Sequence, residues 1–131
     1  MREDSASTVP GHVVVVIDDD LAVRNSLKFS LEIEGLTVRS YATGAELLSA
    51  GDLALCNCLV VDQNMPGMNG LELIALVRAR CFAAPAILIT SHPSPSLRDR
   101  AQKAGVPIVE KPLLGNALLD KIRDVVGIGT S

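Results

Sequence analysis

The stretch VVVVIDDDLAVR, residues 13–24, decides the fold. Its first five residues are apolar and β-branched with no polar residue among them, a pattern typical of a strand covered on both faces of a parallel sheet. Three aspartates follow directly. Two carboxylates about 4 Å apart repel by roughly 4 kcal/mol at an effective dielectric of 20, so such a cluster needs a proton, a cation or water. Three acids at the end of a buried segment therefore indicate a functional site.

Short apolar runs of the same kind recur along the chain, separated by amphipathic stretches. The strand candidates are residues 13–17, 36–41, 58–61, 86–90 and 108–110. Strands that alternate with helical stretches of this length predict an α/β domain with a doubly wound parallel sheet. In such sheets ligands bind beyond the carboxyl ends of the strands.

The stretches between the strands carry helix signals. The first predicted helix has Asp20 as its N-cap and ends at Gly35, and the second begins with the capping-box pair Thr43 and Glu46. Gly70 opens a third helix, and Ser94 with Pro95 precedes a fourth. The fifth is indicated by apolar residues at helical spacing, namely Leu114, Leu118, Ile122 and Val125. The fourth helix offers only Leu97, Ala101 and Ala104 to a core. We therefore expect it to be the most mobile helix.

Composition limits the class of protein. The chain has 131 residues, of which 48% are hydrophobic, enough for one domain with its own core. With a net charge of −3 and only Phe29, Tyr41 and Phe82 available to stack on bases, direct nucleic-acid binding is not expected. No apolar run approaches the roughly 20 residues of a membrane span, and we expect a cytoplasmic protein.

Three further expectations concern the cysteines and the ends of the chain. Cys56, Cys58 and Cys81 fit neither a zinc site nor a redox pair, so we interpret them as small core residues. Residues 1–11 are polar and end in Pro-Gly, which predicts a flexible leader, and residues 127–131 predict a frayed tail. The folded domain is then expected over residues 12–126.

Polar residues that can carry chemistry lie at the ends of four of the five strand candidates. Asp18 and Asp19 follow the first strand, Asp62 the third, Thr90 ends the fourth, and Lys111 follows the fifth. A parallel sheet brings these residues to one edge. Carboxylates are suitable ligands for Mg²⁺, one of them can attack phosphorus, and Lys111 and Thr90 suit the phosphoryl oxygens.

Four motifs now identify a family. The segments IDDD, VVDQNMPGMNG, ILITS and VEKP, which begin at residues 17, 60, 87 and 109, together resemble the receiver domain of two-component response regulators. The resemblance extends from residue 13 to residue 126. The segments ITSHP and VEKP are similar to the corresponding segments of receivers of the nitrogen-fixation regulator type. The family implies a flavodoxin-like (βα)5 sandwich with strand order 2-1-3-4-5.

Site roles follow from this resemblance, position by position. It implies that Asp62 is the phosphoacceptor, that Asp18 and Asp19 are the acidic pair, and that Lys111 pairs with the phosphate. Further implied roles are Mg²⁺ ligation by Asp19, Asp62 and the backbone carbonyl of Asn64, a switch hydroxyl at Thr90, a cis bond before Pro112, and Gly70 in the loop motif. Mn²⁺ is expected to substitute for Mg²⁺.

The resemblance also implies a function and partners. A histidine kinase or phosphotransfer protein would phosphorylate Asp62, and the change of charge would switch a partner-binding surface. Such a protein is a signalling phosphoacceptor that assists its own phosphorylation and dephosphorylation. It is not a turnover enzyme. A homodimer through the fourth and fifth β-α units is a further expectation.

One position departs from the family pattern. Receivers commonly carry Tyr or Phe three residues before the lysine as a rotamer switch, and here that position is Ile108. An aliphatic side chain has no ring to swing between buried and exposed positions. Pro93 and Pro95 also stiffen the loop after Thr90.

Two alternative functions stay open at this point. Asp18 and Asp20 have the D-x-D spacing of a haloacid-dehalogenase-type phosphatase, although helix capping is the competing interpretation of Asp20. Ile108 and the proline-rich loop fit a phosphorylation-independent interaction module with receiver architecture. The sequence also leaves open whether the chain is a standalone receiver or part of a longer regulator.

Overall fold

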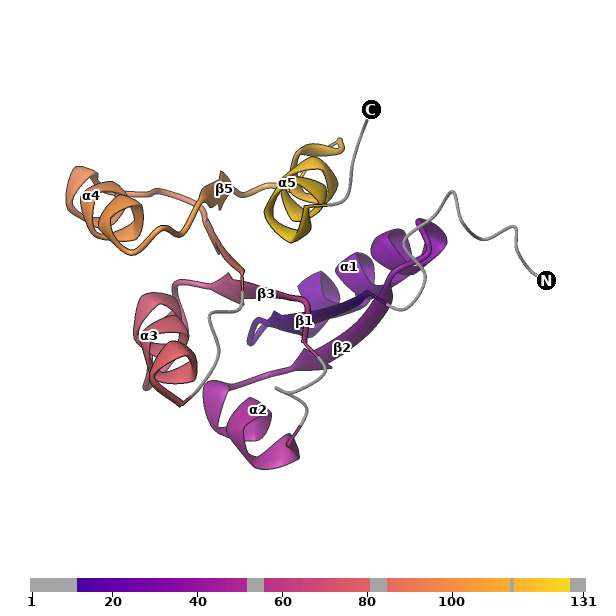
Figure 1. Ribbon diagram of the computed structural model, residues 1–131, viewed down its shortest axis with the longest axis horizontal. Coiled ribbons are helices and arrows are strands. Elements are labelled where there is room, and N and C mark those ends of the chain that lie inside the picture. The colour runs from indigo at the N-terminus through magenta and orange to yellow at the C-terminus, as the bar shows by residue number, and fades with distance from the viewer. Residues whose placement is uncertain (1–11, 52–55, 81–84, 114, 128–131) are drawn as a thin grey trace.

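The structure is a computed structural model that describes residues 12–51, 56–80, 85–113 and 115–127. The elements are β1 (Val13–Ile17), α1 (Leu21–Ile33), β2 (Thr37–Tyr41), α2 (Gly44–Ala50), β3 (Cys58–Asp62), α3 (Gly70–Arg80), β4 (Ala86–Thr90), α4 (Pro95–Lys103), β5 (Ile108–Glu110) and α5 (Ala117–Val126). All paired strands are parallel, in the order β2-β1-β3-β4-β5 (Figure 1). The predicted flavodoxin-like (βα)5 sandwich is confirmed. No helix within the described residues is long and apolar enough to cross a membrane.

The sheet has a hydrophobic cluster on each face, and β1 contributes to both. Val14 and Val16 pack on one side with the apolar faces of α1 and α5, whereas Val15 and Ile17 pack on the other side with α2, α3 and α4. Successive side chains of a strand point to opposite faces. A strand covered on both sides therefore has no polar position, which explains the unbroken apolar run that opens the domain.

Most of the predicted helix boundaries are confirmed. The Asp20 side chain accepts a hydrogen bond from the Ala22 N–H at 2.9 Å, and the Thr43 hydroxyl accepts one from the Glu46 N–H at 3.1 Å. The Glu46 carboxylate departs from the capping-box pattern, because it reaches the N–H of Ala42, one residue before the cap. β2 begins at Thr37, one residue later than predicted, and β3 continues to Asp62.

The fourth helix agrees with the prediction at its start and differs at its end. The Ser94 hydroxyl accepts a hydrogen bond from the Leu97 N–H at 3.0 Å, and Leu97 and Ala101 are buried. The prediction that Ala104 faces the core is wrong. α4 ends at Lys103, so Ala104 is the exposed C-cap residue and Val106 fills the core beyond it. The expected mobility of this helix stays a prediction.

The described cysteines are core residues, as predicted. Cys58 is fully buried and Cys56 is partly buried against the sheet. Burial raises the pKa of Cys56 to about 11 and that of Cys58 to about 12, so both thiols stay protonated near neutral pH. Cys81, Leu114, the predicted leader at 1–11 and residues 128–131 of the predicted tail lie outside the described residues.

The start of α3 is joined to the strand that carries Asp62. The Gly70 N–H donates to the Gln63 carbonyl at 3.2 Å, and the Leu71 N–H donates to the Gln63 side chain at 2.9 Å. Asn69 and Glu72 form a reciprocal capping box with two bonds of 2.9 Å. All four N–H groups that a helix start leaves without a helical partner are thereby bonded. The orientation of α3 and the backbone beside Asp62 are therefore fixed together.

Gly70 is required by this close packing, and its substitution provides a test. A Cβ atom at residue 70 would lie 2.7 Å from the Asp62 carbonyl oxygen and 2.7 Å from a Leu88 methyl group. We predict that Gly70→Ala lowers the free energy of unfolding by about 1–3 kcal/mol, because backbone must move to admit the methyl group. Urea denaturation measures the change.

Gly44→Ala is the matched control, since Gly44 also opens a helix. There the three atoms nearest to an added Cβ all belong to the Leu73 side chain, and the nearest is a methyl group at 2.9 Å. We expect the free energy of unfolding to change by less than about 1 kcal/mol, because a rotamer change suffices and alanine favours helix. Equal destabilisation by the two substitutions would contradict the packing argument.

Candidate functional site

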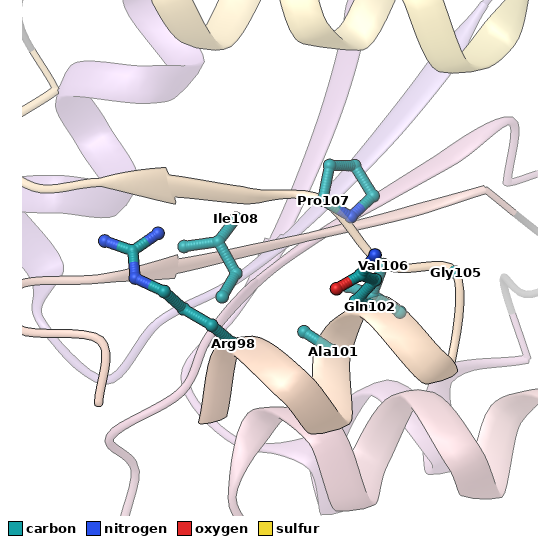
Figure 2. A pocket seen from close by; sticks show the side chains of 7 residues that line it. All are labelled: Arg98, Ala101, Gln102, Gly105, Val106, Pro107 and Ile108. Carbon is teal, nitrogen blue, oxygen red and sulfur yellow. The ribbon is translucent and has the colours of Figure 1, made fainter. Parts of the chain in front are cut away.

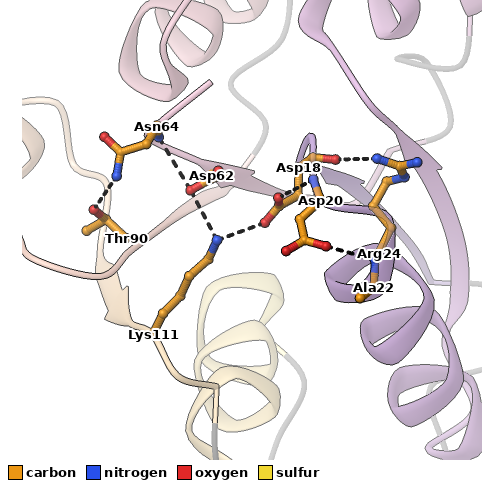
Figure 3. A network of polar contacts seen from close by, with 8 residues as sticks. All are labelled: Asp18, Asp20, Ala22, Arg24, Asp62, Asn64, Thr90 and Lys111. Atoms are coloured by element: carbon orange, nitrogen blue, oxygen red, sulfur yellow. Dashed lines mark hydrogen bonds and ion pairs between the residues drawn. The ribbon is translucent and has the colours of Figure 1, made fainter. Parts of the chain in front are cut away.

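The carboxyl ends of the strands bring the predicted site residues together (Figure 3). Ile17 pairs with Val61 in the β1–β3 register, so Asp18 and Asp62 follow on neighbouring strands. Thr90 ends β4, and Lys111 follows β5 at the sheet edge. Asp18 and Lys111 are 93 positions apart in the chain, yet their side chains are in contact.

Three of the carboxylates form a cluster suited to a cation. Asp18, Asp19 and Asp62 each offer an oxygen atom, and these atoms lie within 4.8 Å of one another. Asp18 and Asp62 are buried, while Asp19 is exposed at the mouth of the site. A set of carboxylate oxygens that is open to water on one side fits a hard divalent cation such as Mg²⁺. Asp20 is outside this cluster and caps α1 instead.

Lys111 lies between the two buried carboxylates. Its Nζ atom is 3.1 Å from Asp18 Oδ2 and 3.4 Å from Asp62 Oδ1. The Lys111 N–H also donates to the Thr90 carbonyl at 2.9 Å, and the Lys111–Pro112 peptide bond is cis, as predicted. The hydrogen bond to Thr90 holds the backbone of Lys111 beside the end of β4.

The charges in the site shift the pKa values of Asp62 and Lys111. Burial and the nearby charge of Asp18 raise the pKa of Asp62, and these effects exceed the opposing effect of Lys111. Burial alone would lower the pKa of Lys111, but the two carboxylates raise it above its ordinary value. Lys111 therefore offsets only part of the combined effect of burial and of the Asp18 charge on Asp62.

Arg24 supports the acidic loop in a way that the sequence did not predict. Its guanidinium group donates to the Asp18 carbonyl at 2.6 Å, while the Asp18 side chain accepts a bond from the Asp20 N–H at 2.9 Å. Arg24 is six residues after Asp18 and one helical turn into α1. The only signal in the sequence was its spacing of six residues from Asp18.

The side chains of Gln63 and Asn64 were also missed by the sequence reasoning. The Asn64 N–H donates to Asp62 Oδ1 at 3.4 Å, and its side-chain Nδ2 donates to the Thr90 hydroxyl at 3.3 Å. The sequence analysis used only the backbone carbonyl of Asn64. Proximity to Asp62 was the available signal, but the path of the loop determines which groups these amides reach.

Ile108 lies away from the acidic cluster, at a hollow between α4 and β5 (Figure 2). The hollow has a volume of about 380 Å³ and is lined by Ile108, Pro107, Ala101 and Arg98 among others. Arg98 spans its rim to form an ion pair with Glu110 at 2.6 Å. Ile108 is partly buried against the core, and none of the described residues that line the hollow is aromatic.

The raised pKa of Asp62 predicts how stability depends on pH when no divalent cation is present. The folded protein holds the Asp62 proton more tightly than the unfolded chain, so this group costs stability as the pH rises above its ordinary pKa of 3.8. We expect Asp62→Asn to raise the free energy of unfolding at pH 7 in EDTA. The gain should disappear at acidic pH, where the wild-type group is protonated in both states.

Asp99→Asn is the control for this measurement, because Asp99 is exposed and, within the part of the chain that the structure describes, pairs only with Lys103 on the helix surface. Denaturation across the pH range should give parallel curves for this variant and the wild type. A loss of stability on Asp62→Asn at pH 7 would contradict the balance of charges described above.

Comparisons with known proteins agree with this geometry. The sequence model of the response regulator receiver domain matches residues 14–123. The chain is 40% identical over 115 residues to the transcriptional regulatory protein FixJ of Azorhizobium caulinodans, covering 87% of this chain and 54% of that protein. It is 37% identical over 110 residues to the C4-dicarboxylate transport transcriptional regulatory protein DctR of Rhodobacter capsulatus, covering 82% and 56%.

Solved structures give the same result. The chemotaxis protein CheY4 of Vibrio cholerae superimposes with a TM-score of 0.80 at 26% identity, over 87% of this chain and 98% of that one. The chain spans about half the length of the curated relatives it matches. The motifs, the strand order and these matches together establish that the chain belongs to the response regulator receiver domain family.

Proposed function

We propose that this receiver domain is a phosphorylation-dependent switch in which Asp62 accepts a phosphoryl group from a histidine kinase or a phosphotransfer protein. The observation that supports this most is the cluster of Asp18, Asp19 and Asp62 with Lys111 against two of them. The cluster combines a nucleophilic carboxylate, a cation site and a fixed ammonium group, which are the groups that phosphoryl transfer to a carboxylate needs.

In the proposed reaction, a carboxylate oxygen of Asp62 attacks phosphorus. The new O–P bond forms as the bond between phosphorus and the donor breaks, and the electron pair leaves with the donor. Lys111 then pairs with a phosphoryl oxygen, and the Thr90 hydroxyl donates to another. Asp19, Asp62 and the Asn64 carbonyl would hold Mg²⁺, or Mn²⁺ in its place, and the cation would neutralise charge on the phosphoryl group.

We further propose how the domain is used in the cell. The folded unit of this proposal is residues 12–126. The surface of α4 and β5, with its hollow beside Ile108, is the face that partners or a second copy would contact (Figure 2). Several relatives are named transcriptional regulators, so we infer that this domain acts in the cytoplasm and controls an effector. The net charge of −3 supports the further inference that the domain does not itself bind nucleic acid.

The alternative functions differ in their support. A phosphatase of the haloacid dehalogenase type would need Asp20 as its second acid, but the Asp20 side chain is bonded to the start of α1 and lies outside the cluster. A phosphorylation-independent module is favoured only by Ile108 and the proline-rich loop. The buried acidic set would then have no role to offset the cost of holding Asp18 and Asp62 together.

Labelling by a small phosphodonor tests the proposal. We predict that acetyl phosphate with Mg²⁺ adds one phosphoryl group to the wild type, that EDTA prevents this, and that Asp62→Asn abolishes it. Asp19→Asn should slow labelling at least about 10-fold and increase the Mg²⁺ concentration required, because it removes a ligand. Intact-protein mass spectrometry measures the label.

Asp20→Asn is the matched control, since it changes the neighbouring charge but keeps an N-cap residue. Its labelling rate should stay within about twofold of wild type. If the wild type takes no label while folded, the phosphorylation-independent module becomes the better interpretation. Label on Asp62→Asn that equals wild type would refute Asp62 as the acceptor.

A further inference from the structure

The side chain of Asn64 contacts the hydroxyl group of Thr90 at the end of β4. Its Nδ2 donates to the Thr90 hydroxyl oxygen at 3.3 Å, and its backbone N–H donates to Asp62 Oδ1 at 3.4 Å (Figure 3). Residue 64 therefore touches both the carboxylate proposed to react and the hydroxyl proposed to bind the product. Asn64 itself is exposed, whereas Thr90 is only 2% exposed.

The direction of this hydrogen bond determines what Thr90 can do next. A threonine hydroxyl has one hydrogen to donate and two lone pairs that accept. Because Asn64 supplies the hydrogen in their contact, the bond occupies a lone pair and leaves the Thr90 hydrogen available. The backbone of Thr90 is held separately, since its carbonyl accepts from the Lys111 N–H at 2.9 Å. With the main chain fixed, the Asn64 contact restrains the rotation of the hydroxyl group.

We propose that the Asn64 side chain is a positioning residue that holds the Thr90 hydroxyl with its hydrogen directed toward a phosphoryl group on Asp62. This role rests on the proposed function of Asp62. It is distinct from the backbone carbonyl of Asn64 as a metal ligand, because an amide side chain and a main-chain oxygen can be separated by mutation. Among the described residues the Asn64 side chain is bonded to the Thr90 hydroxyl, so its effect on phosphorylation should pass through Thr90.

A double-mutant cycle tests this path. The rate of labelling by acetyl phosphate is measured at saturating Mg²⁺ for the wild type, Asn64→Ala, Thr90→Ala and the double variant. We expect Asn64→Ala to slow labelling by about 3- to 10-fold, the range of one hydrogen bond. In the Thr90→Ala background, Asn64→Ala should change the rate by less than about twofold, because the group that it positions is gone.

The Mg²⁺ dependence separates positioning from general loosening of the loop. Asn64→Ala keeps the backbone carbonyl, so the Mg²⁺ concentration for half-maximal rate should match wild type while the maximal rate falls. The affinity for beryllofluoride with Mg²⁺, a mimic of the phosphoryl group, should fall by a similar factor. A shift in the Mg²⁺ requirement without a change in maximal rate would overturn the proposal, since that would indicate a disturbed metal site.

Asn64→Asp tests the direction of the bond. A carboxylate keeps the size of the amide but cannot donate, so it would draw the Thr90 hydrogen toward itself. We expect labelling slower than in Asn64→Ala, and the part of that decrease that persists in the Thr90→Ala background reports the added charge. If Asn64→Ala labels faster than wild type, the Thr90 hydrogen was already directed at Asn64 and the proposal is wrong.

These results remain distinct from a failure of the proposed function. A wild type that takes no label overturns both proposals. A wild type that is labelled on Asp62, with Asn64→Ala labelled at the same rate or slowed equally in both Thr90 backgrounds, overturns only the role of Asn64. Thermal unfolding of each variant verifies that the compared proteins are folded.

Discussion

The contact of Lys111 with Asp18 and Asp62 is the interaction on which the site depends. Two buried carboxylates are costly to hold together, and the ammonium group that offsets them comes from the far end of the sheet. With Asp19 the cluster carries three negative charges against one positive charge, which leaves an excess of two. Burial and then the charge of Asp18 raise the pKa of Asp62. A divalent cation would neutralise the excess negative charge.

The loop after β3 connects this charge balance to the rest of the domain. Gln63 bonds the start of α3 through both its carbonyl and its side chain, while Asn64 bonds Thr90 at the end of β4. A shift of Asp62 is therefore opposed by two secondary-structure elements. Such a loop restrains the geometry of the site, because its polar groups are bonded to regular structure.

The sequence predicted the sheet and the members of the acidic site, and it did so for physical reasons. A strand covered on both faces has no polar position, so an unbroken apolar run such as residues 13–17 predicts a strand. The polar residues directly after these runs lie at one edge of the sheet. Hydrogen bonds within loops follow no such period. The side-chain contacts of Gln63 and Asn64 depend on the path of the loop. The burial of Ala104 was predicted wrongly because α4 ends at Lys103, one residue before Ala104.

Ile108 affects how a structural change at the acidic site would be transmitted to the surface of α4 and β5. Thr90 pairs with Glu110 in the β4–β5 register, and its carbonyl is bonded to the Lys111 N–H. A displacement of Thr90 would thus act on β5, whose other end carries Ile108 and one wall of the hollow beside α4. An aliphatic residue has no ring to rotate out of that hollow. Communication through this edge would therefore change the packing of α4 against β5, and the Arg98–Glu110 ion pair joins those two elements at the rim.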